Sequence, residues 1–126
     1  MTPKLEQATI LVVDDEQAIV TLLVDILTDA GYRVITARNG REALACLDRE
    51  RADLILSDVM MPVMDGLALY QTVQVSPALQ SIPIILMSAV ASFNSQIRGN
   101  SNTQLITKPF DLDMLLATID RYLAQQ

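Results

Sequence analysis

Thr9-Ile10-Leu11-Val12-Val13-Asp14-Asp15 is a nearly unbroken apolar run that stops at two carboxylates. A second run, Asp53-Leu54-Ile55-Leu56-Ser57-Asp58, ends in the same way. Short runs rich in Val, Ile and Leu, without alternation of polar residues, are typical of strands that are buried on both faces. The two segments therefore predict inner strands of a parallel sheet, over residues 9–13 and 53–57.

Helical patterns alternate with runs of this kind along the chain. Over residues 19–30 the apolar side chains follow one stripe of a 3.6-residue helix, and Gly31 is the expected C-cap. Further strands are predicted over residues 33–37, 82–87 and 104–107, and further helices at Asn39 or Gly40, near Asp65, over 91–98 and near Asp111.

Strands that alternate with helices indicate an α/β fold of the (βα)₅ type, with a doubly wound parallel sheet. Right-handed crossovers favour the flavodoxin-like strand order 2-1-3-4-5. No linker, repeat or break in composition divides the chain, so we expect one domain over residues 1–126, with a core at about 8–124 and no output domain. Such sheets bind ligands beyond the carboxyl ends of their strands.

Composition excludes several classes of protein. The chain has 126 residues, 51% of them hydrophobic, and a lone cysteine, which argues against a disordered or disulfide-rich protein. Fifteen acidic residues outweigh nine basic ones with no basic stripe, which argues against direct binding to nucleic acid. The absence of histidine removes the commonest general base and most zinc sites. No apolar run approaches the roughly 20 residues that span a bilayer, so we expect a cytoplasmic protein without membrane contact.

The residues at the strand ends carry the chemistry. Asp14 and Asp15 follow the first strand, Asp58 the third, Ser88 the fourth and Lys108 the fifth. In the order 2-1-3-4-5 these four strands are neighbours, so the side chains converge on one crevice. A single aspartate after a strand is commonly a helix cap or turn residue. Their joint placement at four strand ends is what favours a site.

The cluster predicts a magnesium ion. Three nearby carboxylates repel one another, and Lys108 supplies only one positive charge. Mg²⁺ is held in proteins by one or two carboxylates together with waters and phosphate oxygens. We expect Asp15 and Asp58 to be direct ligands and Asp14 to bind directly or through water. The backbone carbonyl of Met60 could complete the set.

Such a site is suited to phosphoryl transfer. A carboxylate can act as a nucleophile and form an aspartyl phosphate, and Asp58 is the candidate. The reaction depends on positioning and on neutralising the phosphoryl oxygens more than on acid–base catalysis. Mg²⁺ would bind one oxygen, Lys108 a second and the Ser88 hydroxyl a third. Without histidine in this chain, the phosphoryl group must arrive from outside.

These residues make the chain resemble the receiver domains of two-component response regulators, the CheY-like superfamily, along nearly its whole length. The motifs that carry the resemblance are Ile10-Leu11-Val12-Val13-Asp14-Asp15-Glu16, Asp53-Leu54-Ile55-Leu56-Ser57-Asp58-Val59-Met60-Met61-Pro62, Met64-Asp65-Gly66, Ser88-Ala89 and Lys108-Pro109-Phe110. As an ordered combination they are highly specific.

The resemblance implies a role for each site residue. Asp58 matches the phospho-acceptor, Asp14 and Asp15 the acidic metal pair, Lys108 the phosphate-contacting lysine and Ser88 the switch hydroxyl. It also implies a cis Lys108-Pro109 bond. The donor would be a phosphohistidine on a histidine kinase or a histidine phosphotransfer protein, and an unidentified downstream protein would respond.

Two departures from the family pattern concern signal transmission. Leu105 stands where the family usually has an aromatic residue that swings inward. The segment over residues 89–107 is short and lacks the usual Gly-Ala before the last strand. It is rich in Ser, Asn and Gly, which are poor residues for a helix interior. We expect a short fourth helix, a mobile loop and an atypical output face.

An aspartate-nucleophile phosphohydrolase would need a second aspartate two positions after the nucleophile, where this chain has Met60, so we expect no conventional enzyme, although self-dephosphorylation is compatible with the site. A receiver-like interaction domain that works without phosphorylation is disfavoured by the intact acidic, serine and lysine positions, but Leu105 and the altered fourth helix leave it open. A soft-metal site at Met60, Met61 and Met64 is less favoured than ordinary packing, because no cysteine or histidine joins these thioethers.

Overall fold

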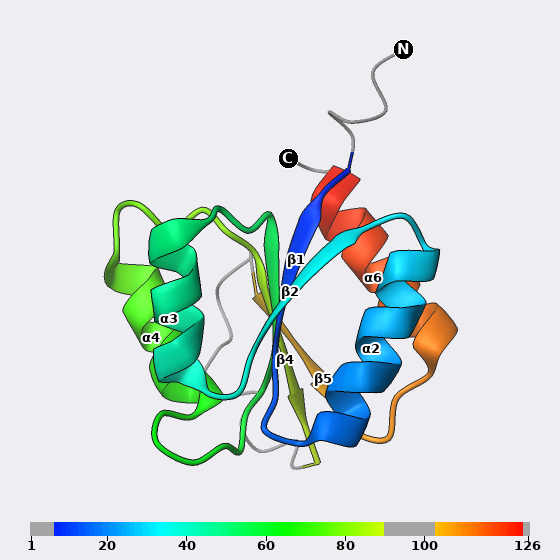
Figure 1. Cartoon of the computed structure of the whole chain (residues 1–126), viewed down its shortest axis with the longest axis horizontal. Coiled ribbons are helices and arrows are strands. Elements are labelled where there is room, and N and C mark those ends of the chain that lie inside the picture. The colour runs from blue at the N-terminus through cyan, green and yellow to red at the C-terminus, as the bar shows by residue number, and fades with distance from the viewer. Residues whose placement is uncertain (1–6, 90–102, 125–126) are drawn as a thin grey trace.

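The computed structural model describes residues 7–89 and 103–124, in which a parallel five-stranded sheet has the order β2-β1-β3-β4-β5 (Figure 1). The strands are β1 (Thr9–Val13), β2 (Arg33–Ala37), β3 (Leu54–Asp58), β4 (Ile84–Ser88) and β5 (Thr103–Thr107). The helices are α2 (Gln17–Asp29), α3 (Gly40–Arg49), α4 (Gly66–Val75) and α6 (Leu112–Ala124). The predicted fold class and strand order are confirmed. The helix expected over 91–98 lies outside the described residues.

Helices cover both faces of the sheet. Figure 1 shows α3 and α4 on one face and α2 and α6 on the other. Side chains that alternate along each strand point to opposite faces, so Leu11 and Ile55 pack toward α3 and α4, whereas Ile10 and Leu54 pack toward α2 and α6. This double burial is why the inner strands are apolar except near their ends.

Side chains cap the first turns of α3 and α4. The Asn39 side chain accepts a hydrogen bond from the Glu42 amide at 3.0 Å and caps α3. The Asp65 carboxylate accepts one from the Ala68 amide at 2.9 Å and caps α4, as expected. Gly31, the expected C-cap of the first helix, lies one residue beyond it, because Ala30 is the C-cap and Gly31 follows with a φ of +98°.

The fourth strand begins at Ile84 and not at Ile82 as predicted. Pro83 has no N–H to donate to a sheet, and the Ile82 amide donates to the Leu79 carbonyl in the preceding turn at 2.9 Å. The fifth strand begins one residue earlier than expected, at Thr103, which pairs with Ile84.

Two candidate site residues belong to strands rather than to the loops that follow them. Asp58 is the last residue of β3 and is in register with Met87, and the Val59 amide extends the ladder by donating to the Met87 carbonyl at 2.9 Å. Ser88 is the last residue of β4 and is in register with Thr107. Backbone hydrogen bonds of the sheet therefore hold both residues in place.

The loop between β3 and α4, residues 59–65, is held at both ends by backbone hydrogen bonds. The Gly66 amide donates to the Val59 carbonyl at 2.8 Å, and the Gly40 amide of α3 donates to the Met64 carbonyl at 2.8 Å. Between these two points Val63 has a φ of +69°. This left-handed conformation is rare for a β-branched residue.

Among the helices in the described ranges, none combines the length and the apolar character that crossing a membrane would require.

The backbone of Val63 predicts a stabilising substitution. The Val63 side chain is 74% exposed, so replacing it with glycine removes little buried surface. Glycine also adopts a positive φ without the steric cost that valine has there. We expect Val63→Gly to raise the free energy of unfolding by about 0.5–1 kcal/mol in urea denaturation followed by circular dichroism.

Val75 is a matched control, because it is an 80% exposed valine at the end of α4 and has no positive φ. Val75→Gly should lower the free energy of unfolding by about 0.5–1 kcal/mol, since glycine weakens a helix. Equal losses of stability in both variants would show that the Val63 backbone carries no strain.

Candidate functional site

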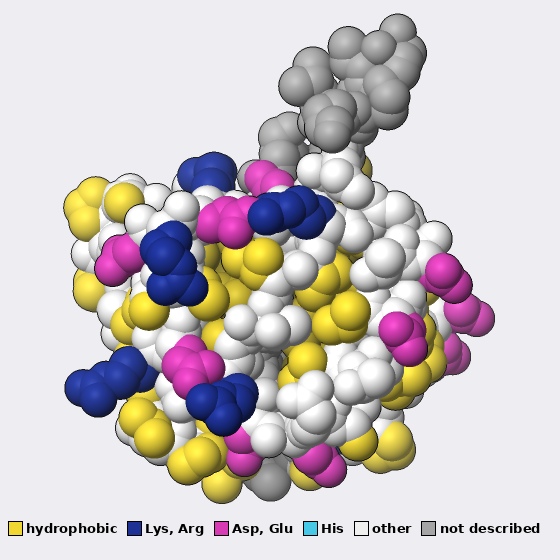
Figure 2. All heavy atoms as spheres, viewed as in Figure 1, with side chains coloured by type: hydrophobic (Ala, Val, Ile, Leu, Met, Phe, Trp, Pro, Cys, Tyr) yellow, Lys and Arg dark blue, Asp and Glu magenta, His cyan; other side chains and the backbone are white. Residues whose placement is uncertain are grey.

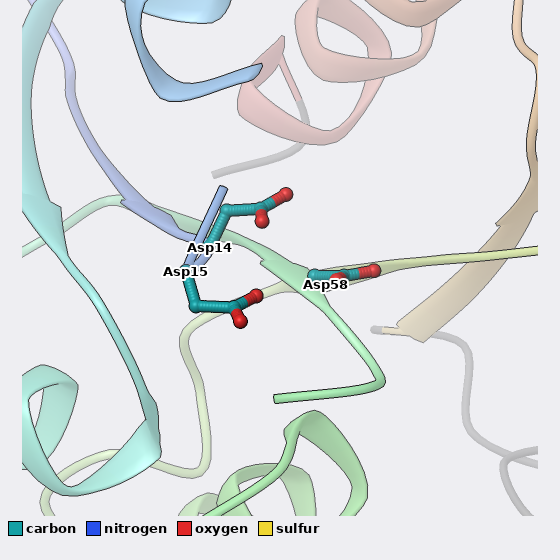
Figure 3. Close-up of side chains that lie close together, drawn as sticks. All are labelled: Asp14, Asp15 and Asp58. Carbon is teal, nitrogen blue, oxygen red and sulfur yellow. The ribbon is translucent and has the colours of Figure 1, made fainter. Parts of the chain in front are cut away.

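Three carboxylates meet at the carboxyl end of the sheet. Asp14 and Asp15 follow β1 and Asp58 ends β3, and Figure 3 shows their side chains directed toward one region. Each offers an oxygen atom that lies within 4.8 Å of an oxygen of the other two. β1 and β3 are adjacent parallel strands, which is why residues 43 or more positions apart in the chain converge. The sequence prediction of an acidic crevice is consistent with this geometry.

The three carboxylates differ in exposure. Asp14 is 1% exposed, Asp58 is also buried, and Asp15 is exposed. One Asp14 oxygen, Oδ1, accepts a hydrogen bond from the Glu16 amide at 2.9 Å. The other, Oδ2, is buried and has no hydrogen-bond partner among the residues that the structure describes. A buried carboxylate oxygen without a donor is costly unless another group satisfies it.

Lys108 brings the positive charge to this cluster from the end of β5. Its ammonium nitrogen lies 3.1 Å from Asp58 Oδ1 and 4.0 Å from Asp14 Oδ2. The Lys108 amide donates to the Ser88 carbonyl at 2.7 Å, which anchors the residue beside β4. The expected cis Lys108-Pro109 bond is present. Asp58 therefore has an ammonium group as its direct neighbour.

The electrostatics of Asp14 reflect this crowding. The pKa of the Asp14 carboxyl is raised from 3.8 to about 6, chiefly by burial, and the negative charges of Asp58 and Asp15 contribute to this rise. The Glu16 amide and the Lys108 ammonium act in the opposite direction without cancelling the effect. The carboxylate form of Asp14 is therefore held in an unfavourable environment at neutral pH.

The remaining sequence-predicted residues lie at the same edge of the sheet. Ser88 is buried at the end of β4, the strand between Asp58 and Lys108. Met60 follows Asp58 by two residues, and its side chain is 64% exposed. The structure thus brings Asp14, Asp15, Asp58 and Lys108 into one cluster and places the other two residues on the segments that border it.

The donor set fits a hard divalent cation. Carboxylate oxygens are the ligands that Mg²⁺ prefers, and the site offers three carboxylates against a single ammonium. The buried Asp14 Oδ2, without a hydrogen-bond donor in the described part of the chain, is an unsatisfied acceptor facing the same cluster. A cation would offset both the repulsion and the unmet acceptor.

Sequence reasoning missed the residues that shape the loop after Asp58. The sequence indicates Gly40 only as the start of a helix and Gly66 only as part of a motif, but in the structure both allow a close approach to residues 58–64. The positive φ of Val63 has no signal in the sequence, because valine is among the residues least expected there.

Comparison with known proteins places this chain in a family. The family model described as "Response regulator receiver domain" matches residues 10–120. Among curated proteins, the chain is 38% identical over 121 residues to the transcriptional regulatory protein GlrR of Escherichia coli, with 94% of this chain and 27% of that protein covered. The chain thus spans about a quarter of the length of this relative.

Solved structures agree with this match. The receiver domain of a signal transduction histidine kinase from Syntrophus aciditrophicus is 37% identical, with a TM-score of 0.86 over 94% of this chain and 91% of that one. The receiver domain of sensor histidine kinase PA1611 from Pseudomonas aeruginosa is 26% identical, with a TM-score of 0.82 over 94% and 98% of the two chains. That domain is described with a magnesium ion coordinated in its active-site cleft.

The match over most of the chain, the sheet order and the acidic cluster beside a lysine lead to one conclusion: this chain belongs to the response regulator receiver domain family of two-component systems.

Proposed function

We propose that this chain is a phospho-acceptor switch of a two-component or phosphorelay system, in which Asp58 accepts the phosphoryl group. The observation that carries this proposal is the 3.1 Å contact between the Lys108 ammonium and the Asp58 carboxylate, within a cluster of three aspartates. Asp58 ends a strand held by backbone bonds, so its carboxylate has a fixed position next to the positive charge. These are the conditions that a carboxylate nucleophile needs.

The reaction is a displacement at phosphorus. A carboxylate oxygen of Asp58 attacks the phosphorus atom, and the bond from phosphorus to the donor breaks as the new oxygen–phosphorus bond forms. With a phosphohistidine donor whose other ring nitrogen is protonated, the bonding electron pair stays on the nitrogen that held the phosphorus, and the ring leaves as a neutral imidazole. Lys108 stabilises the charge on a phosphoryl oxygen, and the Ser88 hydroxyl donates to another.

Magnesium is the cofactor that this site would hold. Asp15 and Asp58 would be direct ligands, Asp14 would bind directly or through water, and the Met60 carbonyl would complete the protein ligands. When bound, Mg²⁺ neutralises negative charge on a phosphoryl oxygen during transfer. The clustered carboxylates and the buried Asp14 Oδ2 support this assignment. The related domain from Pseudomonas aeruginosa, which is described with magnesium in its cleft, supports it as well.

Switching would follow from contacts that only the phosphorylated state makes. A phosphoryl group adds negative charge and acceptor oxygens at Asp58. It gains hydrogen bonds with Lys108 and Ser88 that exist in only one of two conformations, and these contacts shift the population toward that conformation. Charge-assisted hydrogen bonds of this kind can supply the roughly 5 kcal/mol that is required to invert the population ratio of the two conformations almost completely.

The proposed partners are proteins. The donor would be a histidine kinase or a histidine phosphotransfer protein, and the target an unidentified downstream protein. Direct binding to nucleic acid is not proposed. Arg33 and Arg38 pair with Glu50 and Glu42, and Figure 2 shows basic side chains mixed with acidic ones over the α3 side of this face, with acidic ones along the α2 edge. Phosphate-backbone binding needs a more continuous basic surface.

The remaining expectations are part of this proposal. We propose a cytoplasmic domain with residues 1–126 as one unit and a core over about 8–124. The domain accepts a phosphoryl group without being a conventional enzyme, because Met60 stands where an aspartate phosphohydrolase would need its acid–base residue. Self-dephosphorylation is compatible with this role.

The first test is phosphorylation by a small-molecule donor. Incubation with acetyl phosphate and Mg²⁺ should add the mass of one phosphoryl group to the wild type, measured on the intact protein. Asp58→Asn should gain nothing, because an amide oxygen is a poor nucleophile. Removal of Mg²⁺ with EDTA should also prevent the gain.

Asp65→Asn provides the control for this test. Asp65 is an exposed aspartate that caps α4 in the same segment of the chain, and its substitution should leave the mass gain intact. A wild type that gains no mass under any condition would rule out the acceptor role. The phosphorylation-independent interaction domain would then be favoured, and Leu105, which has no ring to swing, is consistent with that outcome.

The second test uses the raised pKa of Asp14. Since the folded-state pKa of about 6 exceeds the ordinary 3.8, ionisation of Asp14 opposes folding, and the fold loses stability as the pH rises from about 4 through 6. Without Mg²⁺ at pH 7.5, Asp14→Asn should therefore raise the free energy of unfolding, by about 1–2 kcal/mol after allowance for solvent screening. At pH 3.5 the gain should disappear.

Mg²⁺ should reverse the order of the two free energies of unfolding, because it should stabilise the wild type more than it stabilises Asp14→Asn. The wild-type affinity for Mg²⁺ should weaken below about pH 6, where protons compete for Asp14. Asp25→Asn removes an equal charge from an exposed position on α2 and should change neither property. An equal gain in Asp25→Asn would show that net charge, and not the acidic cluster, is responsible.

A further inference from the structure

The loop over residues 59–65 leads from the acidic cluster to α4. None of the three carboxylates of the cluster belongs to that helix. The loop leaves β3 directly after Asp58 and includes Met60. It returns to the sheet edge at Gly66, whose amide donates to the Val59 carbonyl at 2.8 Å. A Cβ atom at Gly66 would overlap the Asp58 carbonyl oxygen, so the return of the chain to β3 requires glycine.

The second attachment point is Gly40, the first residue of α3. Its amide donates to the Met64 carbonyl at 2.8 Å. A Cβ atom there would lie 2.8 Å from Met64 Cγ, 3.0 Å from its carbonyl oxygen and 3.1 Å from Sδ. The Met64 side chain and backbone therefore both close over the bare Cα of Gly40.

The residue with the unusual backbone lies directly before Met64. Val63 has a φ of +69° and stands between Val59 and Met64, whose carbonyls accept the hydrogen bonds of Gly66 and Gly40. The Met64 amide also donates to the Pro62 carbonyl at 2.7 Å, which tightens the turn around Val63. A backbone conformation of this kind persists only where its surroundings enforce it. The two glycine contacts are part of the surroundings that hold the loop in this path.

We propose that Gly40 is a positioning residue for the Asp58 site. It acts through Met64, because the close contact between the two residues fixes the loop that leaves Asp58 and carries Met60. The inference rests on the proposed function, in which this loop contributes a carbonyl ligand for Mg²⁺ next to Asp58. A side chain at Gly40 would displace Met64 and, with it, the loop, while leaving all three carboxylates unchanged.

Gly40→Ala tests this proposal in two ways. In the metal-free protein labelled with ¹⁵N, the amide resonances of Asp58, Val59 and Met60 should shift, whereas those of Ile10 and Leu11 in the neighbouring strand should stay in place. In the second measurement, titration with Mg²⁺ alone at pH 7.5 should give a dissociation constant raised by about tenfold, the lower end of the range for residues that orient ligands.

Gly31→Ala is the matched control. Gly31 has a φ of +98°, so alanine is strained there, yet a Cβ atom would meet nothing within 4 Å and the residue lies at the far end of α2. The variant should lower the melting temperature while leaving the resonances of residues 58–60 and the Mg²⁺ dissociation constant as in the wild type. It therefore separates lost stability from lost positioning.

Met64→Ala decides the question if Gly40→Ala does not fold. It removes the side chain that covers Gly40 without introducing a clash, and it should change the same resonances and weaken Mg²⁺ binding by a smaller factor. Unchanged resonances at 58–60 together with an unchanged dissociation constant would overturn the positioning role. If the wild type itself bound no Mg²⁺, the proposed function would fail, and the metal-free resonances would still decide the role of Gly40.

Discussion

The repulsion among three carboxylates at one edge of the sheet is the constraint around which this structure is organised. Asp14 and Asp58 are buried, and Lys108 is the one ammonium group near both among the residues described. Burial of charge without full compensation destabilises a fold, and the raised pKa of Asp14 is the measure of this cost. In the proposed function, a cation or a phosphoryl group completes this cluster and offsets that cost.

The sheet supplies the rigidity that such a cluster needs. Asp58 and Ser88 are the last residues of β3 and β4, where ladder hydrogen bonds fix the backbone, and Lys108 is tied to Ser88 by its amide. The strands themselves are buried between α2 and α6 on one face and α3 and α4 on the other. The apolar core therefore offsets the electrostatic cost and also prevents the carboxylates from moving apart to relieve it.

Most of the fold and the four-residue cluster could be predicted from the sequence, because both follow from local patterns. Apolar runs that stop at Asp14 and at Asp58 mark strands and their carboxyl ends at once, and the parallel order brings these ends together. Strand limits were less accurate where a single residue decides them. Pro83 has no N–H to donate to the sheet, so β4 begins after it, at Ile84. The apolar pattern of the neighbouring residues does not indicate this local effect.

The shape of the loop after Asp58 could not be predicted, because it depends on contacts between segments that are distant in the sequence. Gly40 and Met64 are unremarkable by themselves, and only the fold brings the start of α3 against this loop. Valine at position 63 even argues against the conformation that it adopts. Local preference was overridden here by tertiary contacts, as is common where a backbone is shaped for a site.

The two sides of the cluster differ in how firmly they are held, and this difference bears on signalling. The side formed by Asp58 and its loop is attached to its own strand through Gly66 and to α3 through Gly40. On the other side, Lys108 reaches the cluster through its long side chain, and Leu105 of β5 is only partly buried against the core. A phosphoryl group on Asp58 would attract groups of opposite charge toward itself, and the less constrained side would move the more. In the proposed switch, the acceptor side therefore serves as the fixed reference, and the conformational response belongs to the side of Lys108 and β5.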